Sequence, residues 1–348
     1  MRIGWKGMTE MKKNLLAFAA CLLAALMLAG CGKTGAAAES PAQETETQEA
    51  AGTAETPAEE AEEAAPAAEP VEASDAEPDA DGAEEPAAEP AADSAETASG
   101  SPVVYFTADI SAEGLVKIYD ALGWTPDGNT AVKISTGEPP ASNYLRPELI
   151  GDLVKKVDGT IVECNTAYGG SRASTAMHKQ VAEDHGFTAI ADFDLMDEEG
   201  EVEWPMAGGT RLDRVIVGSH AENYTDWVIL SHFKGHAMAG FGGAIKNVGI
   251  GISSPSGKVY VHTAGTKTSG SIFYKDQDAW LEALAEMVYG FSSHVGKEHI
   301  VYINVMNRLS VDCDCDGNPA EPDIHDIGIL ASSDPVALDQ ACVDLVYH

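Results

Sequence analysis

Hydrophobic residues from position 103 onward fall into short runs that alternate with stretches of helical period. The runs have the length of buried strands and occupy 103–106, 131–134, 160–163, 215–218, 227–230, 300–305 and 327–331. The stretches between them predict helices over 111–122, 146–156, 171–184 and 278–289, and a last helix opens at Asp334-Pro335. This alternation predicts an α/β fold over residues 101–348, with a largely parallel sheet covered by helices.

The first 31 residues follow a different pattern. Lys12 and Lys13 precede an apolar stretch, 15–26, that is too short to span a bilayer and leads into Leu28-Ala29-Gly30-Cys31. This ending is the lipobox pattern cut by lipoprotein signal peptidase, so we expect Cys31 to carry the lipid. The sequence therefore predicts an extracytoplasmic lipoprotein anchored to the cell membrane through Cys31. A plain cleaved signal peptide or a buried apolar helix is the alternative.

Residues 32–100 consist almost entirely of Ala, Glu, Pro, Asp, Thr and Ser, with no aromatic residue. The segment carries 20 acidic residues against the single Lys33. Such a composition cannot bury enough apolar area to offset chain entropy, and its like charges repel one another. We expect a disordered acidic linker between the anchor and the domain.

Charge excludes one class of partner for the domain. The chain has a net charge of −35; the linker contributes −19 and residues 1–31 contribute +3, which leaves −19 for residues 101–348. A surface this acidic repels a phosphate backbone, so we expect no nucleic-acid partner.

Candidate chemistry is concentrated in residues 227–251, where a hydrophobic strand runs into a glycine-rich loop. The polar members of this stretch are His232, Lys234, His236 and Lys246, and the glycines are Gly240, Gly242, Gly243, Gly249 and Gly251. Glycines let a backbone approach a ligand closely and present N–H groups to an anion. The loop fits neither of the common nucleotide-binding patterns. A glycine-rich packing turn with ordinary hydrogen-bonded histidines is the alternative.

A second candidate is the cysteine pair Cys313 and Cys315, which is surrounded by aspartates at 312, 314 and 316. In a turn, both thiols can reach one soft metal ion. Bound metal, a disulfide and two free thiols all remain open for this pair. The isolated Cys164 and Cys342 are expected in the core. Arg172, at the start of a predicted helix, can hold an anionic ligand or form a surface ion pair.

Three stretches together resemble the domain-of-unknown-function 362 family, whose members are often described as iron–sulfur-centre proteins. They are 233–252, the Cys313–Cys315 pair and 326–346, and the resemblance covers 103 to the end of the chain. It implies the fold and a site around the glycine loop and the cysteine pair. The stretch 266–276, where ferredoxin-type cysteines are expected in the family, contains none. The sequence therefore carries no ferredoxin-type four-cysteine motif for an iron–sulfur centre.

A weaker, local stretch is similar to the nickel-pincer lactate racemase family. His236 is followed by Lys246 ten residues later and by His262 sixteen residues further on. The resemblance implies an acid/base histidine at His236, a cofactor-attaching lysine at Lys246 and a metal ligand at His262. That family's other catalytic histidine has no counterpart here, because the equivalent turn carries Tyr168.

Two functional hypotheses follow. The first is a metal- or cofactor-dependent protein with redox or isomerase-type chemistry, in which His236 and Lys246 are catalytic and His262, Cys313 and Cys315 bind a transition metal. In this hypothesis the cofactor contacts Gly240, Gly242, Gly243, Lys234 and Arg172. The second is a non-catalytic lipoprotein that binds a small anion through the loop 240–251 and Arg172.

Overall fold

The computed structural model of the chain describes residues 101–273 and 276–347. The predicted signal peptide with Cys31 and the predicted linker, 32–100, lie outside the described residues and stay predictions. Within the described ranges, no helix is long and apolar enough to cross a membrane.

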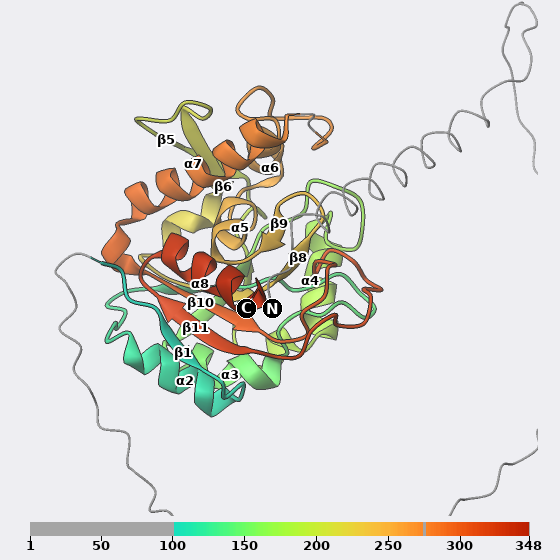
Figure 1. Cartoon of the computed structure of the whole chain (residues 1–348). Coiled ribbons are helices and arrows are strands. Elements are labelled where there is room, and N and C mark those ends of the chain that lie inside the picture. Colours follow the sequence, from blue (N-terminus) through green and yellow to red (C-terminus); the bar gives the residue numbers. More distant parts are fainter. Residues whose placement is uncertain (1–100, 274–275, 348) are drawn as a thin grey trace, which may run out of the picture. The chain divides into compact units, whose positions relative to one another are not determined.

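A seven-stranded sheet forms the centre of the domain, in the order β1-β11-β10-β7-β2-β3-β4 (Figure 1). Its strands are β1 (Tyr105–Thr107), β2 (Thr130–Lys133), β3 (Gly159–Glu163), β4 (Phe193–Leu195), β7 (Asp226–His232), β10 (Ile300–Met306) and β11 (Gly328–Ser332). All neighbours from β10 to β4 are parallel, whereas β11 runs antiparallel to β10 and β1 antiparallel to β11. The predicted α/β class with a largely parallel sheet is confirmed.

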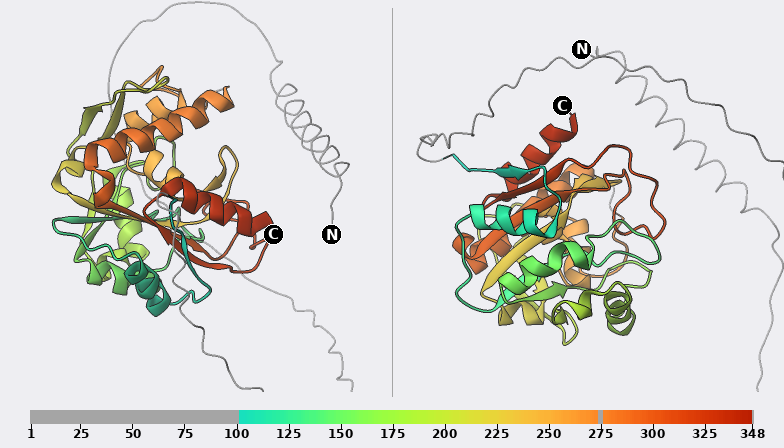
Figure 2. Two further views of the ribbon diagram at one scale, coloured as in Figure 1. Left: turned by 60° about the vertical axis from the view of Figure 1, so that its left-hand side comes forward. Right: turned by 90° about the horizontal axis from the view of Figure 1, so that it is seen from below.

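Helices cover both faces of the sheet (Figures 1 and 2). They are α2 (Ala112–Ala121), α3 (Pro147–Lys156), α4 (Thr175–Asp184), α5 (Ala244–Gly249), α6 (Pro255–His262), α7 (Gln277–Val295) and α8 (Pro335–Tyr347). On one face α2 and α3 pack over Val228 and Leu230, and on the other α5 to α8 pack over Trp227 and Ile229. This alternation along β7 is what a strand buried on both faces requires.

Several elements differ from the sequence prediction. The strand predicted at 215–218 is β6 (Arg214–Gly218), which pairs with β5 (Glu201–Pro205) in a separate two-stranded sheet. The glycine-rich stretch forms a hairpin of β8 (Lys234–His236) and β9 (Gly240–Gly242), followed by α5 and α6. No helix was predicted there, because two short helices broken by glycines show no extended apolar period. Helix α4 begins four residues later than predicted, because Thr166 N–H donates to the carbonyl of Arg172 and closes a turn.

The chain order of the strands creates a switch point between β2 and β7. From β2 the chain proceeds outward to β3 and β4, and it then returns to place β7 and β10 on the other side of β2. In open α/β sheets, ligands bind outside the carboxyl ends of the strands at such a point. The fold therefore predicts a ligand site at the carboxyl ends of β2, β3 and β7.

Side-chain caps hold the predicted helix starts. Ser111 Oγ accepts from Gly114 N at 3.0 Å, and Asp334 Oδ1 accepts from Val336 N at 2.9 Å. A second carboxylate, that of the buried Asp339 on α8, joins separate elements. It accepts from the backbone N–H groups of Ala244 and Ile245 on α5, at 2.8 and 3.0 Å, and from the Asn304 amide of β10 at 2.7 Å.

We expect Asp339→Ala to lower the free energy of unfolding by about 3 kcal/mol, because it leaves buried N–H donors without an acceptor. Urea denaturation at neutral pH measures the change. Asp344→Ala is the matched control on the same helix, since Asp344 is exposed and bonds only Gln340 among the described residues. Equal stability of the two variants would contradict the proposed link between α8 and α5.

Candidate functional site

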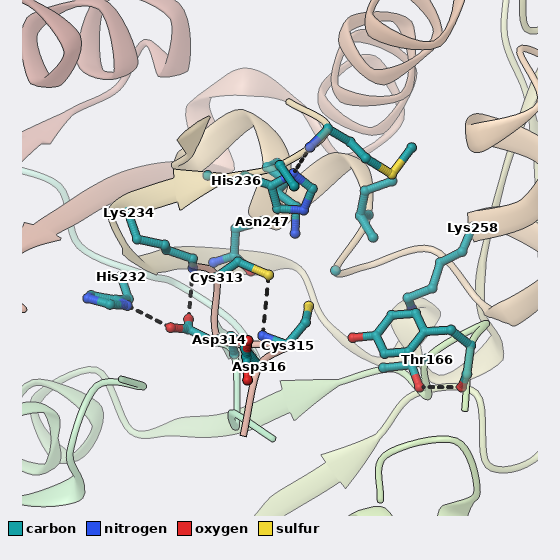
Figure 3. Close-up of a pocket in the computed structure, with 18 of the residues that line it drawn as sticks. Thr166, His232, Lys234, His236, Asn247, Lys258, Cys313, Asp314, Cys315 and Asp316 are labelled. Carbon is teal, nitrogen blue, oxygen red and sulfur yellow. Dashed lines mark hydrogen bonds and ion pairs between the residues drawn. The ribbon is translucent and has the colours of Figure 1, made fainter. Parts of the chain in front are cut away.

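A cavity of about 590 Å³ lies at the switch point (Figure 3). Its wall combines the carboxyl ends of β2, β3 and β7 with the β8–β9 hairpin, α5, α6 and the loop after β10. All the polar residues predicted for the site line this cavity: they are Arg172, Lys234, His236, Lys246, His262, Cys313 and Cys315. Segments far apart in the sequence therefore meet where the strand order reverses.

Lys133 and Glu163 form a buried ion pair at the base of the cavity. They end the neighbouring strands β2 and β3, and Lys133 Nζ lies 2.7 Å from Glu163 Oε2. Asn247 of α5 accepts from the same ammonium at 3.0 Å, and its amide donates to the carbonyls of Lys133 and Leu230. Burial would raise the pKa of Glu163, but the charges of Lys133, His178 and Arg172 lower it to about 2.

Arg172 is held inside this network. It is 4% exposed, with its Nε 3.1 Å from Glu138 Oε2 and its Nη1 3.8 Å from Glu163 Oε1. The ion pair that the sequence left open for Arg172 is present, but it is buried rather than on the surface. The predicted contact between Arg172 and a cofactor stays a prediction.

Cys313 and Cys315 belong to a turn that Asp314 holds in place. The turn closes with Asp316 N donating to the carbonyl of Cys313 at 2.9 Å. The Asp314 carboxylate is fully buried and lies 2.7 Å from His232 Nδ1 and 2.8 Å from Lys234 Nζ. Both cysteines line the cavity, and of the alternatives left open for the pair the structure has two free thiols.

The two thiols are electrostatically unequal. A hydrogen bond from Cys313 lowers the pKa of the Cys315 thiol; burial opposes this, and the charges of Lys246 and Arg172 assist it. The pKa of the Cys313 thiol is raised, because it is the donor of that bond and is buried. A thiolate is the form that attacks electrophiles and binds metals, and the lowered pKa favours that form at Cys315 over Cys313. Burial raises the pKa of Cys164 to about 12, and the predicted core position of Cys164 and Cys342 is confirmed.

His236 and His262 are both neutral imidazoles at neutral pH. Burial, with the charges of Lys246 and Lys234, lowers the pKa of His236 to about 3. Its Nδ1 accepts from Met238 N and Ala239 N at 3.2 and 3.0 Å, so the ring hydrogen resides on Nε2. Nε2 of His236 therefore serves as a hydrogen-bond donor rather than as a metal ligand.

The imidazole ring of His262, unlike that of His236, forms no hydrogen bond with any described residue. Burial, then the charges of Lys246 and Lys258, lower its pKa to about 4. The ring stacks on Trp280 with centroids 5.1 Å apart, and its buried Nδ1 has no partner within the described residues. A neutral imidazole without a partner has a lone pair free for a metal or a ligand.

The distances between possible ligand atoms show which residues could bind one metal ion without rearrangement. In the described ranges, one group of three His, Cys, Asp or Glu residues has its ligand atoms within 4.8 Å of one another: Asp127, Asp226 and His299. Cys313, Cys315 and His262 do not meet this criterion, so they are not a preassembled three-ligand site.

The group around Asp226 lies at the amino end of β7, whereas the cavity lies at the carboxyl ends of the parallel strands. The Asp226 carboxylate already accepts from Gly128 N at 2.9 Å and from His299 Nδ1 at 3.0 Å. Asp226 thereby joins the loop before β2 and the segment before β10 to the start of β7, which gives its contacts a structural explanation.

The glycines of the loop have separate structural explanations. Gly240 has a φ of +80° at the tip of the hairpin and does not line the cavity. A Cβ on Gly242 would lie 3.2 Å from Lys246 Cδ, and one on Gly243 would lie 2.4 Å from Asp339 Oδ1. The N–H groups after Gly243 are bonded to Asp339. Cofactor contacts of these glycines stay a prediction.

Several residues of the site were not predicted from the sequence: Lys133, Glu163, Asn247, Lys258 and Asp314. A signal was present for two of them, since Lys133 and Glu163 are charged residues within the predicted strand runs 131–134 and 160–163. A charge in such a position is costly unless it is paired, which predicts a buried partner. The other three lie in helices or loops whose contacts the local sequence does not determine.

Residues 130–344 match the model of a family described as Domain of unknown function (DUF362). No curated protein matches the sequence. Among solved structures, the lactate racemase apoprotein from Thermoanaerobacterium thermosaccharolyticum is similar, with 15% identity and a TM-score of 0.40. The similarity covers 67% of this chain and 55% of that chain, so this chain spans little more than half the length of that protein. A likeness of this degree carries no argument about activity.

We expect Glu163→Gln to lower the free energy of unfolding at pH 7 by about 3 kcal/mol, because Lys133 is left as an unpaired buried charge. In the native protein the pKa of Glu163 is lowered from 4.5 to about 2. Its stabilisation is therefore complete above pH 4.5 and is lost as the pH falls toward 2, and Glu163→Gln lacks this part of the pH dependence.

Urea denaturation between pH 7 and pH 2.5 measures both effects. The double variant Lys133→Met/Glu163→Gln is the control and should be less destabilised than Glu163→Gln, because it removes both charges. A single variant as stable as the native protein would show that the pair does not hold the strand ends.

Proposed function

This chain belongs to the DUF362 family, and for it we propose a metal- or cofactor-dependent activity of redox or isomerase type in the cavity at the switch point. The observation that carries the proposal is the Cys313–Cys315 pair, which places one activated thiol inside the cavity beside Lys246. Thiolates select soft transition metals over hard ones. The cavity volume of about 590 Å³ also admits a small organic ligand.

The residues fit a metal bound mainly through sulfur. Cys313 and Cys315 lie in one turn, with Cys315 N 3.4 Å from Cys313 Sγ, so both thiols are available to one ion. The unpartnered ring of His262 supplies a neutral nitrogen ligand from the same cavity wall. Because the three ligand atoms are not preassembled, either the His262 ring moves toward the thiols or the bound ligand completes the coordination sphere.

His236 and Lys246 are proposed as the groups that orient the ligand and balance its charge. With Nδ1 bonded to the backbone, His236 donates a hydrogen bond from Nε2 to a ligand oxygen. Lys246 forms no ion pair with any residue in the described ranges, so its ammonium is available to a ligand. A bound transition metal would supply Lewis-acid or redox chemistry beside these two groups.

The chain is also proposed to be an extracytoplasmic lipoprotein, anchored to the membrane by lipid on Cys31. The lipobox Leu28-Ala29-Gly30-Cys31 and the acidic composition of 32–100 support this proposal.

Non-catalytic binding of a small anion is the second candidate. It is favoured by the number of cationic side chains in the cavity, which include Lys133, Lys234, Lys246 and Lys258. Arg172 and the N–H groups after Gly243, which were expected to bind the anion, are already bonded within the protein. Metal content separates the two candidates.

We expect the full-length protein, purified without oxygen from its native envelope, to contain stoichiometric transition metal. The variant Cys313→Ser/Cys315→Ser should lose most of it, because a hydroxyl is a poor ligand for a soft metal. Inductively coupled plasma mass spectrometry measures the metal. The control is Cys342→Ser, which changes a buried thiol on α8 away from the cavity. Absence of metal from the native protein would leave anion binding as the function.

We expect Cys31→Ser to abolish incorporation of labelled fatty acid and to release the protein from the membrane fraction, because the serine hydroxyl does not accept the lipid. Immunoblotting of membrane and soluble fractions measures the shift. Cys21→Ser, a change in the apolar stretch before the lipobox, is the matched control and should remain anchored. Membrane association unaffected by Cys31→Ser would rule out the lipid anchor.

A further inference from the structure

Lys258 is a buried lysine whose charge has no carboxylate partner among the described residues. It is 5% exposed, and its Nζ donates to the carbonyl of Ser253 at 2.5 Å. An ammonium has three hydrogens to donate, and burying one without acceptors is strongly unfavourable. Because Lys258 lines the cavity, a ligand in the cavity can supply the acceptors that it lacks.

A second cation and a neutral imidazole face the same space. Lys258 and His262 are four residues apart on α6 and therefore lie on one face of that helix. Lys246 of α5 also lines the cavity, and the charges of Lys246 and Lys258 both contribute to the lowered pKa of His262. Three nitrogen groups from two helices thus surround one volume.

The carboxylates of the cavity wall do not neutralise these lysines. Glu163 is engaged by Lys133, and Asp314 by Lys234 and His232. The two remaining acidic side chains accept backbone N–H groups of their own loop: Asp312 from Ala320 and Asp316 from Asn318. Lys246 and Lys258 therefore line the cavity without forming an ion pair with any described residue.

We propose that Lys246, Lys258 and His262 form a subsite for the oxyanion group of a small ligand, which is a carboxylate or a phosphate. The subsite adds a ligand class to the proposed function. It rests on the proposed function only because both are placed in the same cavity. It uses neither Arg172 nor the backbone of the glycine loop. Binding of the anion requires no metal, since every group of the subsite belongs to the chain.

The test is isothermal titration calorimetry of the full chain, treated with chelator, at constant ionic strength. Inorganic phosphate and acetate are the two probes, and saturable binding of either one identifies the preferred group. We expect Lys258→Met to weaken binding of that probe by about tenfold or more, because a charge-assisted hydrogen bond is lost. Without anion, Lys258→Met should melt at the same temperature as the native protein or higher, since the uncompensated charge is gone.

Lys156→Met is the matched control, because Lys156 lies on α3 over the other face of the sheet, paired with Asp120 at 2.9 Å. It should bind the probe as the native protein does. The half-buried Lys246→Met is a second variant, with the same expected loss, should Lys258→Met fail to fold. Absence of saturable binding by both probes, or equal binding by the native protein and the lysine variants of the subsite, would overturn the proposal.

The variant Cys313→Ser/Cys315→Ser makes the two proposals separable. It should keep its affinity for the probe while it loses metal, because the thiols are not part of the subsite. A native protein without metal whose probe affinity depends on Lys258 would refute the metal proposal and support the subsite. A native protein with cysteine-dependent metal but no probe binding would do the reverse.

Discussion

Lys133 and Glu163 carry opposite charges at the carboxyl ends of two adjacent parallel strands, and the arrangement of the cavity depends on their contact. The ammonium lies 2.7 Å from the carboxylate and also donates to Asn247, which bonds the carbonyl of Leu230 in β7. Three strand ends and helix α5 are thereby joined at the switch point. Breaking a buried pair costs far more than a surface pair, because a charge is left without solvent or partner.

The cavity above this pair separates its charged groups into two sets. Asp314 is paired with Lys234 and His232, and these contacts hold the turn that carries both thiols. Lys246 and Lys258 have no such partner in the described residues, and burial, together with their charges, keeps His262 neutral. The cysteine pair and two lysines without ion-pair partners thus line one cavity.

The glycine loop shows that a sequence motif alone does not predict which backbone groups are free to bind a ligand. Gly243 suggested a backbone cradle for a ligand, yet the carboxylate of Asp339 lies where its Cβ would be and accepts the N–H groups that follow. Arg172 likewise has its charge balanced by Glu138 and Glu163. In both cases acidic side chains outside the local motif satisfy the groups that the local pattern left open.

The sequence by itself determined the features that depend on neighbouring residues: the strand runs, most helices, and the helix starts capped by Ser111 and by Asp334. Buried strands are marked by runs of apolar residues, and the hydrogen bonds of helices and caps close within a few positions, so local composition specifies these features. The tertiary structure alone decided that Lys133 meets Glu163, that Asp314 meets Lys234, and that Lys258 has no carboxylate partner among the residues that the structure describes. Those outcomes depend on which strand ends and loops meet at the switch point, and strand order is a property of the whole sheet.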